Sequence, residues 1–361
     1  MPRPIILGVV GDSAAGKTTI TRGLVRILGD EKVTHVCTDD YHRYDRKQRA
    51  ELDITPLDPE CNYIDVMAQH LRHLRTGEPI LKPVYNHHDG TFGPPVYVAP
   101  NAFTVVEGLL GYHTAEMREC YDVRVYLAPP EELRRKWKVA RDTSRRGYTT
   151  DKVLSELDRR EPDSAAYIRP QEQDADIVIA FTPANQGDDS ETLDAELVLR
   201  DGLPHPDLSP FMGNGKGGLQ VDDREDECHV CIPGDIDPER AAEIEEAIWA
   251  RLHFATHLRS QRLGEYTIGN DLHRSESLAL VQLLILYQLA TAKAAIALGG
   301  ETARKDDQQA PGNSQEQHEE EQQEKDAHLR ESEPVADGSG NSKDSGKVEK
   351  ESDDAKEEAK A

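Results

Sequence analysis

The chain has 361 residues, with 43 Lys plus Arg against 68 Asp plus Glu and a formal net charge of −25. This length suggests about two domains and is enough to bury a hydrophobic core. A surface this negative repels phosphate at long range, which argues against nonspecific binding to nucleic acid or to anionic lipid. Any site for a phosphate ligand must therefore be locally basic.

The acidity is unevenly distributed along the chain. Residues 301–361 hold 9 basic and 19 acidic side chains and no aromatic residue. Such a segment buries too little apolar surface to offset chain entropy, so we predict a disordered acidic tail. For the remaining 300 residues, the sequence predicts an α/β domain over residues 1–183 and a smaller mixed α/β appendage over residues 184–300. Five cysteines without paired spacing and an N-terminus without a signal-peptide core favour a reducing, cytoplasmic location.

Short apolar runs alternate with helical patterns in residues 1–183, which is typical of a layered α/β domain with a mostly parallel sheet. The apolar runs predict strands at Ile5–Val10, Val33–Thr38, Phe103–Val106, Val123–Leu127 and Ile177–Phe181, the last of which closes the domain. The helical patterns begin near Lys17 and cover Val66–Arg75, Glu131–Arg145 and Thr150–Arg160.

The appendage reads as short strands followed by helices. Strand candidates are Ala195–Leu199 and His229–Ile232, and Asp237-Pro238 has the residue types that begin a helix. The stretch Leu278–Leu298 is apolar and about long enough to span a bilayer. A membrane span would have to bury two glutamines and a lysine, so we predict a core or interface helix, in which the interrupting residues are Gln282, Gln288 and Lys293.

A glycine-rich loop follows the first predicted strand and opens the first predicted helix. Gly11–Thr18 fits the pattern G-x-x-x-x-G-K-[ST], whose backbone N–H groups hold phosphate oxygens. Lys17 is expected to reach the β- and γ-phosphates, and the Thr18 hydroxyl to contact Mg²⁺. The predicted nucleotide-binding residues are Gly11, Asp12, Ser13, Ala14, Ala15, Gly16, Lys17, Thr18, Thr19 and Lys138.

Two acidic residues end predicted strands beside this loop. Asp39 follows the second strand, where it is able to accept the proton of an attacking hydroxyl, although an Asp at this place also caps loops. Glu107 ends the run Phe103–Val106 and is a candidate acid for the metal, but many strands end in an acid. The sequence lacks the Asn-Lys-x-Asp motif that reads guanine, which counts against a GTPase.

A cationic helix follows the fourth predicted strand. Residues 134–146 contain seven Lys or Arg and one acid, Asp142. Lys138, Arg141 and Arg145 recur at helical spacing on one face. We interpret the helix as a lid that stabilises phosphoryl charge and excludes water, the alternative being an ordinary solvated helix. The predicted catalytic residues are Lys17, Asp39, Arg141, Asp142 and Arg146.

The order of these blocks resembles phosphoribulokinase, within the phosphoribulokinase and uridine kinase family of P-loop kinases. The resemblance is carried by the P-loop, Thr-Asp-Asp-Tyr-His-Arg at 38–43, Leu-Asp-Pro at 57–59, Lys-Pro-Val-Tyr-Asn-His at 82–87, Val-Glu-Gly-Leu at 106–109 and Arg-Asp-x-x-x-Arg-Gly at 141–147. It covers about residues 4–183 closely and 274–298 loosely. It implies ATP-dependent phosphorylation of the C1 hydroxyl of D-ribulose 5-phosphate, a step of Calvin-cycle carbon fixation. A uridine or cytidine kinase, or another small-molecule kinase of the family, is the alternative.

The resemblance also implies roles for matching positions. Asp39 would be the base and Glu107 the metal-linked acid, with ATP and Mg²⁺ as cofactors. The sugar phosphate would contact His42, Arg46, Tyr85 and His87, with Arg49 nearby. The lid cluster would be Lys138, Arg141, Asp142 and Arg146. A homo-oligomer is implied, and we expect a dimer. The acidic tail is either a docking element for a Calvin-cycle protein partner or a solubilising segment.

The cysteines depart from the plant-type pattern of this family. Plant-type relatives carry a P-loop cysteine that pairs with the one before Asp-Asp, whereas here Ala15 leaves Cys37 without that partner. Cys228 and Cys231 form a separate C-x-x-C. A zinc site, a local redox pair and two ordinary strand thiols are all open for this pair, and effector response cannot be carried over from the family.

Overall fold

The structure is a computed structural model that describes residues 3–184, 192–252, 255, 258, 262–268 and 271–304. One compact unit comprises Met1–Gln308. The predicted acidic tail, apart from residues 301–304, lies outside the described residues.

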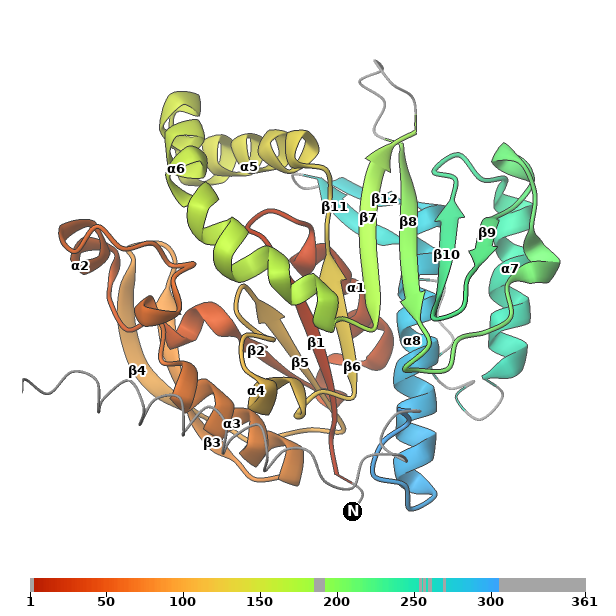
Figure 1. The fold of residues 1–361 in the computed structure, drawn as a ribbon, viewed down its shortest axis with the longest axis horizontal. Helices are drawn as coiled ribbons and strands as arrows, with labels where there is room; N and C mark the ends of the chain where they lie inside the picture. The colour runs from red at the N-terminus through yellow and green to blue at the C-terminus, as the bar shows by residue number, and fades with distance from the viewer. Residues whose placement is uncertain are drawn as a thin grey trace, which may run out of the picture. The chain divides into compact units, whose positions relative to one another are not determined.

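An eight-stranded sheet with the order β2-β5-β1-β6-β7-β8-β10-β9 forms the centre of this unit (Figure 1). Strands β2, β5, β1, β6 and β7 are parallel, and β8, β10 and β9 continue the sheet in antiparallel fashion. The predicted mostly parallel sheet is confirmed. The strands are β1 (Ile5–Gly11), β2 (Val33–Cys37), β5 (Phe103–Gly108), β6 (Val123–Leu127), β7 (Ile177–Pro183), β8 (Leu193–Arg200), β9 (Gln220–Asp223) and β10 (Glu227–Ile232).

The strand predicted at Ile177–Phe181 is present as β7, and the sheet continues beyond it into β8. β7 pairs along its whole length with β8, from Ile177 opposite Leu199 to Pro183 opposite Leu193. The division of the chain at residue 183 stays a prediction, but hydrogen bonding runs across it. β7 is therefore an interior strand of the sheet, between β6 and β8.

Helices cover both faces of the sheet. Ile5, Leu7 and Val9 of β1 belong to one buried cluster and Ile6 and Val10 to another, as expected when successive side chains point to opposite faces. The first cluster includes α1 and α8, and the second includes α3. The helices are α1 (Lys17–Leu28), α2 (Arg46–Glu51), α3 (Ile64–Thr76), α4 (Ala115–Arg118), α5 (Glu131–Arg146), α6 (Thr150–Asp163), α7 (Pro238–Arg251) and α8 (Glu276–Ala297).

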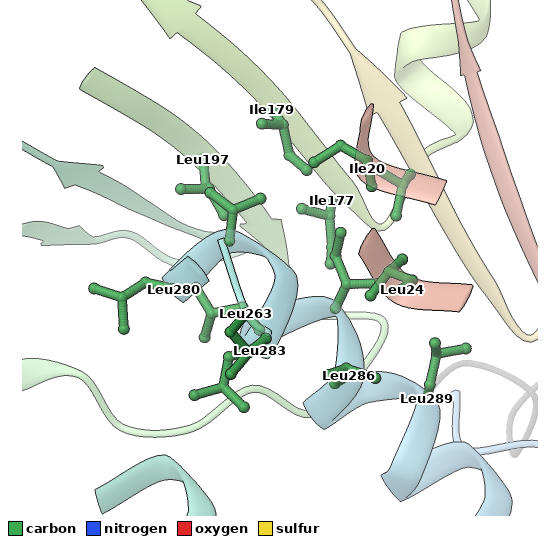
Figure 2. Close-up of a cluster of buried hydrophobic side chains, with 14 of the residues drawn as sticks. Ile20, Leu24, Ile177, Ile179, Leu197, Leu263, Leu280, Leu283, Leu286 and Leu289 are labelled. Atoms are coloured by element: carbon green, nitrogen blue, oxygen red, sulfur yellow. The ribbon is translucent and has the colours of Figure 1, made fainter. Parts of the chain in front are cut away.

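Helix α8 covers the apolar stretch for which the sequence predicts a core or interface helix and not a membrane span. Figure 2 shows its leucines packed with Ile20 and Leu24 of α1 and with side chains of β7 and β8. Gln282 is fully buried, and its Oε1 accepts a hydrogen bond of 2.9 Å from the Gly264 N–H. The helix is long and apolar enough to cross a membrane, but 67% of its most apolar window is buried inside the protein. It is a core helix of this fold.

Two small antiparallel hairpins stand apart from the main sheet and were not predicted. The first pairs β3 (Ile80–Asn86) with β4 (Thr91–Val98), and the second pairs β11 (Glu265–Ile268) with β12 (Asp271–Arg274). Asp40 fastens the first hairpin, because it forms a buried ion pair with Lys82 and accepts a 2.9 Å hydrogen bond from the Tyr85 N–H. This contact sets the position of β3 relative to the end of β2.

Candidate active site

The P-loop leaves β1 and enters α1 through backbone that favours an anion. Gly16, which caps α1, has φ 97°, and Ala14 has φ 70°. Left-handed residues in such a loop turn successive N–H groups toward one concave side. Lys17 Nζ donates to the carbonyls of Gly11 at 2.7 Å and Asp12 at 2.8 Å. The loop therefore holds an ammonium group beside a cradle of N–H donors.

Asp39 lies where the carboxyl ends of three parallel strands meet. β2 and β1 both flank β5, and Cys37 at the end of β2 is in register with Glu107 of β5. Burial opposes ionisation of Asp39, but the nearby His42, His87 and Lys17 together lower its pKa. The His87 Nε2 atom is 3.8 Å from Asp39 Oδ2. Asp39 is therefore a carboxylate between the P-loop and the first hairpin.

Glu107 is a second carboxylate at this edge of the sheet. Its side chain accepts a 2.9 Å hydrogen bond from the Thr21 hydroxyl and lies 3.2 Å from His35 Nε2. Burial raises the pKa of Glu107, but the contacts to His35 and Thr21 and the charge of Lys17 outweigh it and lower the pKa. The site thus keeps a fixed anion close to the P-loop.

Three of the five predicted acceptor residues, His42, His87 and Arg49, pack against the ring of a fourth, Tyr85. That ring meets His42 and His87 edge-on, with centroids 4.9 and 5.1 Å apart. Arg49 is buried and donates from Nη2 to the Tyr85 hydroxyl at 2.6 Å. Arg46 is exposed and donates to the His87 carbonyl at 2.6 Å. The turn after β2, helix α2 and the end of β3 thereby form one neighbourhood that contains two arginines.

The tautomer of His42 follows from its partner. Asn62 Nδ2 donates to the carbonyls of Pro56 and Asp58, so its Oδ1 faces His42 Nδ1 at 2.7 Å. An amide oxygen only accepts, so Nδ1 carries the proton. Burial also lowers the pKa of His42, against the attraction of Asp39. The ring is held in one orientation beside the predicted base.

The cationic helix α5 faces the P-loop, as a lid would. Arg134 Nη1 donates to the Ser13 carbonyl at 3.0 Å, and Lys138 Nζ donates to the Ser13 hydroxyl at 3.1 Å. Arg141 Nη2 reaches the same hydroxyl at 3.4 Å. The spacing of these three residues places them on one face of the helix, whereas the side chains of Arg145 and of the predicted catalytic Arg146 lie outside the described residues.

Asp142 binds two of the lid cations. Its carboxylate is 2.9 Å from Lys138 Nζ and accepts a 2.9 Å hydrogen bond from Arg141 Nε. Burial opposes its charge, but Arg141 and Lys138 lower the pKa of Asp142. A buried carboxylate thus fixes both cations over Ser13.

The remaining P-loop residues differ in where they point. The Asp12 side chain turns toward α5 and α6, where it binds the Ser164 hydroxyl and lies 3.3 Å from Arg134 Nη1. Thr18 and Thr19 are exposed on the first turn of α1. Asp12 therefore links the loop to the lid.

Sequence reasoning missed several partners of the site. His35, Thr21 and Asn62 hold Glu107 and His42 in place, but none of them has a local sequence signal for that role. Lys82 belongs to the motif Lys-Pro-Val-Tyr-Asn-His at 82–87, but nothing in that motif indicates its ion pair with Asp40.

The predicted option of a redox pair within Cys228 and Cys231 is wrong for this fold. Both lie in β10, and each is a free thiol. Residues three apart in a strand are about 10 Å apart and point to opposite faces. A disulfide needs Cα atoms within about 7 Å, so the two cannot join while β10 is paired with β8.

Gly108 permits the close contact between β5 and the turn that carries Asp39. A Cβ at Gly108 would meet Thr38 Oγ1 at 1.7 Å, and that oxygen accepts a hydrogen bond from the Leu109 N–H. We expect Gly108→Ala to lower the free energy of unfolding by about 1–3 kcal/mol, measured by urea denaturation. Gly202→Ala is the control, because a Cβ there meets no described heavy atom within 4 Å. Equal unfolding midpoints for the two variants would contradict the expectation.

Comparison with known proteins identifies a family of kinases. The model of the "Phosphoribulokinase / Uridine kinase family" matches residues 6–187. A phosphoribulokinase of Synechocystis is 40% identical over 205 residues, which are 56% of this chain and 62% of that protein. The chloroplastic phosphoribulokinase of Spinacia oleracea is 32% identical over 219 residues, 55% of this chain and 54% of that protein.

Further relatives extend the comparison. A uridine kinase of Oceanobacillus iheyensis is 30% identical over 182 residues, 49% of this chain and 86% of that protein. The solved phosphoribulokinase of Rhodobacter is 20% identical with a TM-score of 0.52, covering 69% of this chain and 97% of that one, and shows the shared fold. The matched regions span 62% and 54% of the two phosphoribulokinases above. With a family model that matches just over half of its residues and a P-loop placed between β1 and α1, this chain belongs to the phosphoribulokinase and uridine kinase family.

Proposed function

We propose that this protein transfers the γ-phosphoryl group of ATP to the C1 hydroxyl of D-ribulose 5-phosphate, giving ribulose 1,5-bisphosphate and ADP. The observation that carries the proposal is the cationic cluster on the acceptor side of Asp39. Arg46 and Arg49 come from helix α2, and His87 directly follows β3, which carries Tyr85. A substrate that brings its own phosphate needs such groups, whereas an uncharged nucleoside does not.

On the acceptor side, this chain's residues supply a base and an orienting cage. Asp39 is ionised and accepts the proton of the attacking hydroxyl, the role of the catalytic carboxylate in phosphoryl transfer. His42 and Tyr85 have fixed orientations, because Asn62 and Arg49 bind them. They therefore hold the sugar so that one hydroxyl faces Asp39.

On the donor side, the residues present fit ATP with Mg²⁺. The P-loop N–H groups and Lys17 suit the phosphates, and the Thr18 hydroxyl and the Glu107 carboxylate offer the hard oxygen ligands that Mg²⁺ prefers. A bound Mg²⁺ neutralises charge on the phosphates. Lys138 and Arg141 cover the loop through Ser13, which places positive charge where the transferring group becomes more anionic and keeps water away.

The direct test is an ADP-release assay with ribulose 5-phosphate, uridine and cytidine measured side by side. We expect turnover with ribulose 5-phosphate and little with either nucleoside. Turnover with the nucleosides alone would overturn the proposal and favour the uridine kinase branch of the family.

The lid lysine predicts a pH dependence of ATP binding. Burial and the charge of Arg141 lower the pKa of Lys138 to about 8, although Asp142 opposes this. Phosphate binds the protonated form, so binding must take up a proton above that pH. We expect the Kd for a non-hydrolysable ATP analogue to rise by up to about tenfold per pH unit above about pH 8, measured by calorimetry. Lys138→Met should flatten this profile, and parallel profiles for the two proteins would refute the assignment.

A further inference from the structure

We propose that Cys37, Asp39 and His87 form a reversible binding site for Zn²⁺, through which the metal blocks the acceptor side of the enzyme. One donor atom from each residue, the Cys37 Sγ, a carboxylate oxygen of Asp39 and a ring nitrogen of His87, lies within 4.8 Å of the other two. Ligands around a tetrahedral Zn²⁺ sit about 3.5 Å apart when the metal–ligand distances are about 2.0 to 2.3 Å. Closing the site thus requires side-chain shifts of about 1 Å.

The backbone of each ligand is fixed by contacts that do not involve the metal. Cys37 is the last residue of β2 and pairs with Glu107, and Asp39 sits on the short turn Thr38–Tyr41 that follows. The His87 carbonyl accepts a 2.6 Å hydrogen bond from Arg46, and its ring packs edge-on against Tyr85. The hairpin that carries His87 is in turn fastened by Asp40. The three ligands are therefore brought together by the fold.

The donor set selects the kind of metal. A thiolate, an imidazole and a carboxylate suit Zn²⁺, whereas Mg²⁺ requires oxygen ligands and is not expected to compete here. When the metal binds, the Cys37 S–H bond breaks, the S–Zn bond forms and the proton leaves to solvent. Three protein ligands leave one position for water or a substrate hydroxyl.

The surroundings make this a reversible site. Lys17 and Arg49 act on Asp39 through their charge, and they oppose a dication at the same carboxylate. Cys37 is partly exposed and His87 is exposed, so a chelator has access to the metal. The consequence for catalysis rests on the proposed function: a metal on Asp39 occupies the proposed base, so zinc should compete with ribulose 5-phosphate and not with ATP.

Binding is tested first, by titrating the metal-free full-length protein with Co²⁺ and then displacing it with Zn²⁺. We expect one Co²⁺ per chain with a near-ultraviolet thiolate-to-cobalt absorption. Cys37→Ala should lose this absorption and bind Zn²⁺ at least about 100-fold more weakly, because even changes behind a metal ligand cost about 10- to 100-fold. Cys231→Ala, which removes a partly exposed thiol from β10, is the control and should behave like the unmodified protein.

If Cys37→Ala does not fold, Cys37→Ser replaces it, since the hydroxyl keeps the size but cannot give the thiolate absorption. A wild-type protein without that absorption, or a Cys37 variant that binds Zn²⁺ as tightly as the wild type, overturns the site. In the kinase assay, zinc should raise the KM for ribulose 5-phosphate in the wild type and leave the active Cys37→Ala enzyme unaffected. Thiolate-ligated metal without competition at the acceptor supports the metal site, overturns the proposed block of the acceptor side and contradicts Asp39 as the base.

Discussion

Replacing Asp39 with asparagine is expected to lower kcat by about 10²- to 10⁴-fold while leaving the Kd for ATP nearly unchanged. Asparagine keeps the shape of the side chain but cannot accept the proton of the attacking hydroxyl. Because Asp39 lies on the hairpin side of the P-loop, beside His87, its loss removes a base and no phosphate contact. Steady-state kinetics with ribulose 5-phosphate and calorimetric titration with an ATP analogue measure the two quantities.

A substitution at the neighbouring Asp40 distinguishes a catalytic role from a structural one. Asp40 is buried and pairs with Lys82, so Asp40→Asn leaves an uncompensated ammonium group and should lower the free energy of unfolding by about 3 kcal/mol. Asp39→Asn should change stability less, because the ion pair of Asp39 reaches the exposed ring of His87 over 3.8 Å, whereas Asp40 and Lys82 form a close buried pair. Asp65→Asn, an exposed change on α3, controls for loss of charge. Normal kcat in Asp39→Asn would show that the base lies elsewhere.

The lowered pKa of Asp39 has a consequence for wild-type pH profiles. Its positive neighbours keep the carboxylate ionised at pH values below its usual range. The loss of kcat/KM that protonation of Asp39 causes should therefore occur only below about pH 4. A base of this kind is weak. It takes the proton late, as the bond to phosphorus forms, which agrees with a loose transition state in which the nucleophile keeps its proton until late.

The parallel half of the fold was predictable because its strands are recognisable from the local sequence. Buried parallel strands are continuous apolar runs. β1 ends at Gly11 of the P-loop, and β5 carries Glu107 as its last residue but one. The hairpin of β3 and β4 escaped prediction for the opposite reason. β3 contains Lys82-Pro83, and β4 is largely exposed and contains two prolines. Its place is set by Asp40, more than 40 residues away in sequence, and no local pattern encodes that contact.

The same contrast holds for the candidate site, where local sequence predicted some residues and the contacts between distant segments were not predicted. The P-loop, Asp39 and the cationic face of α5 were predicted from spacing, and the structure brings them together around Ser13 and Lys17. The contacts that fix the acceptor residues were not predicted, because the hydrogen bonds of Asn62 to His42 and of Arg49 to Tyr85 join residues that are distant in sequence. Residue type, spacing and the family resemblance therefore named the candidate groups of the site, whereas the contacts that orient them became visible only in the tertiary structure.

The lid arginine should show the second large effect. Arg141 reaches Ser13 from α5 and is oriented by its hydrogen bond to Asp142. In the transition state its guanidinium would face the charge on the transferring phosphoryl group. We therefore expect Arg141→Ala to lower kcat by about 10²- to 10³-fold, measured with saturating ATP and ribulose 5-phosphate.

Lys136→Met is the matched control, because Lys136 is exposed on the same helix and carries the same charge away from the P-loop. It should change kcat less than about twofold, since exposed charges interact weakly through water. Arg141→Lys restores the charge without the planar fork and should recover activity only in part. A variant with normal kcat and a raised KM for ATP would mean that Arg141 binds ground state and transition state equally. The lid would then hold the nucleotide without taking part in the transfer, and the charge that stabilises the transition state would have to come from Lys17 and Lys138.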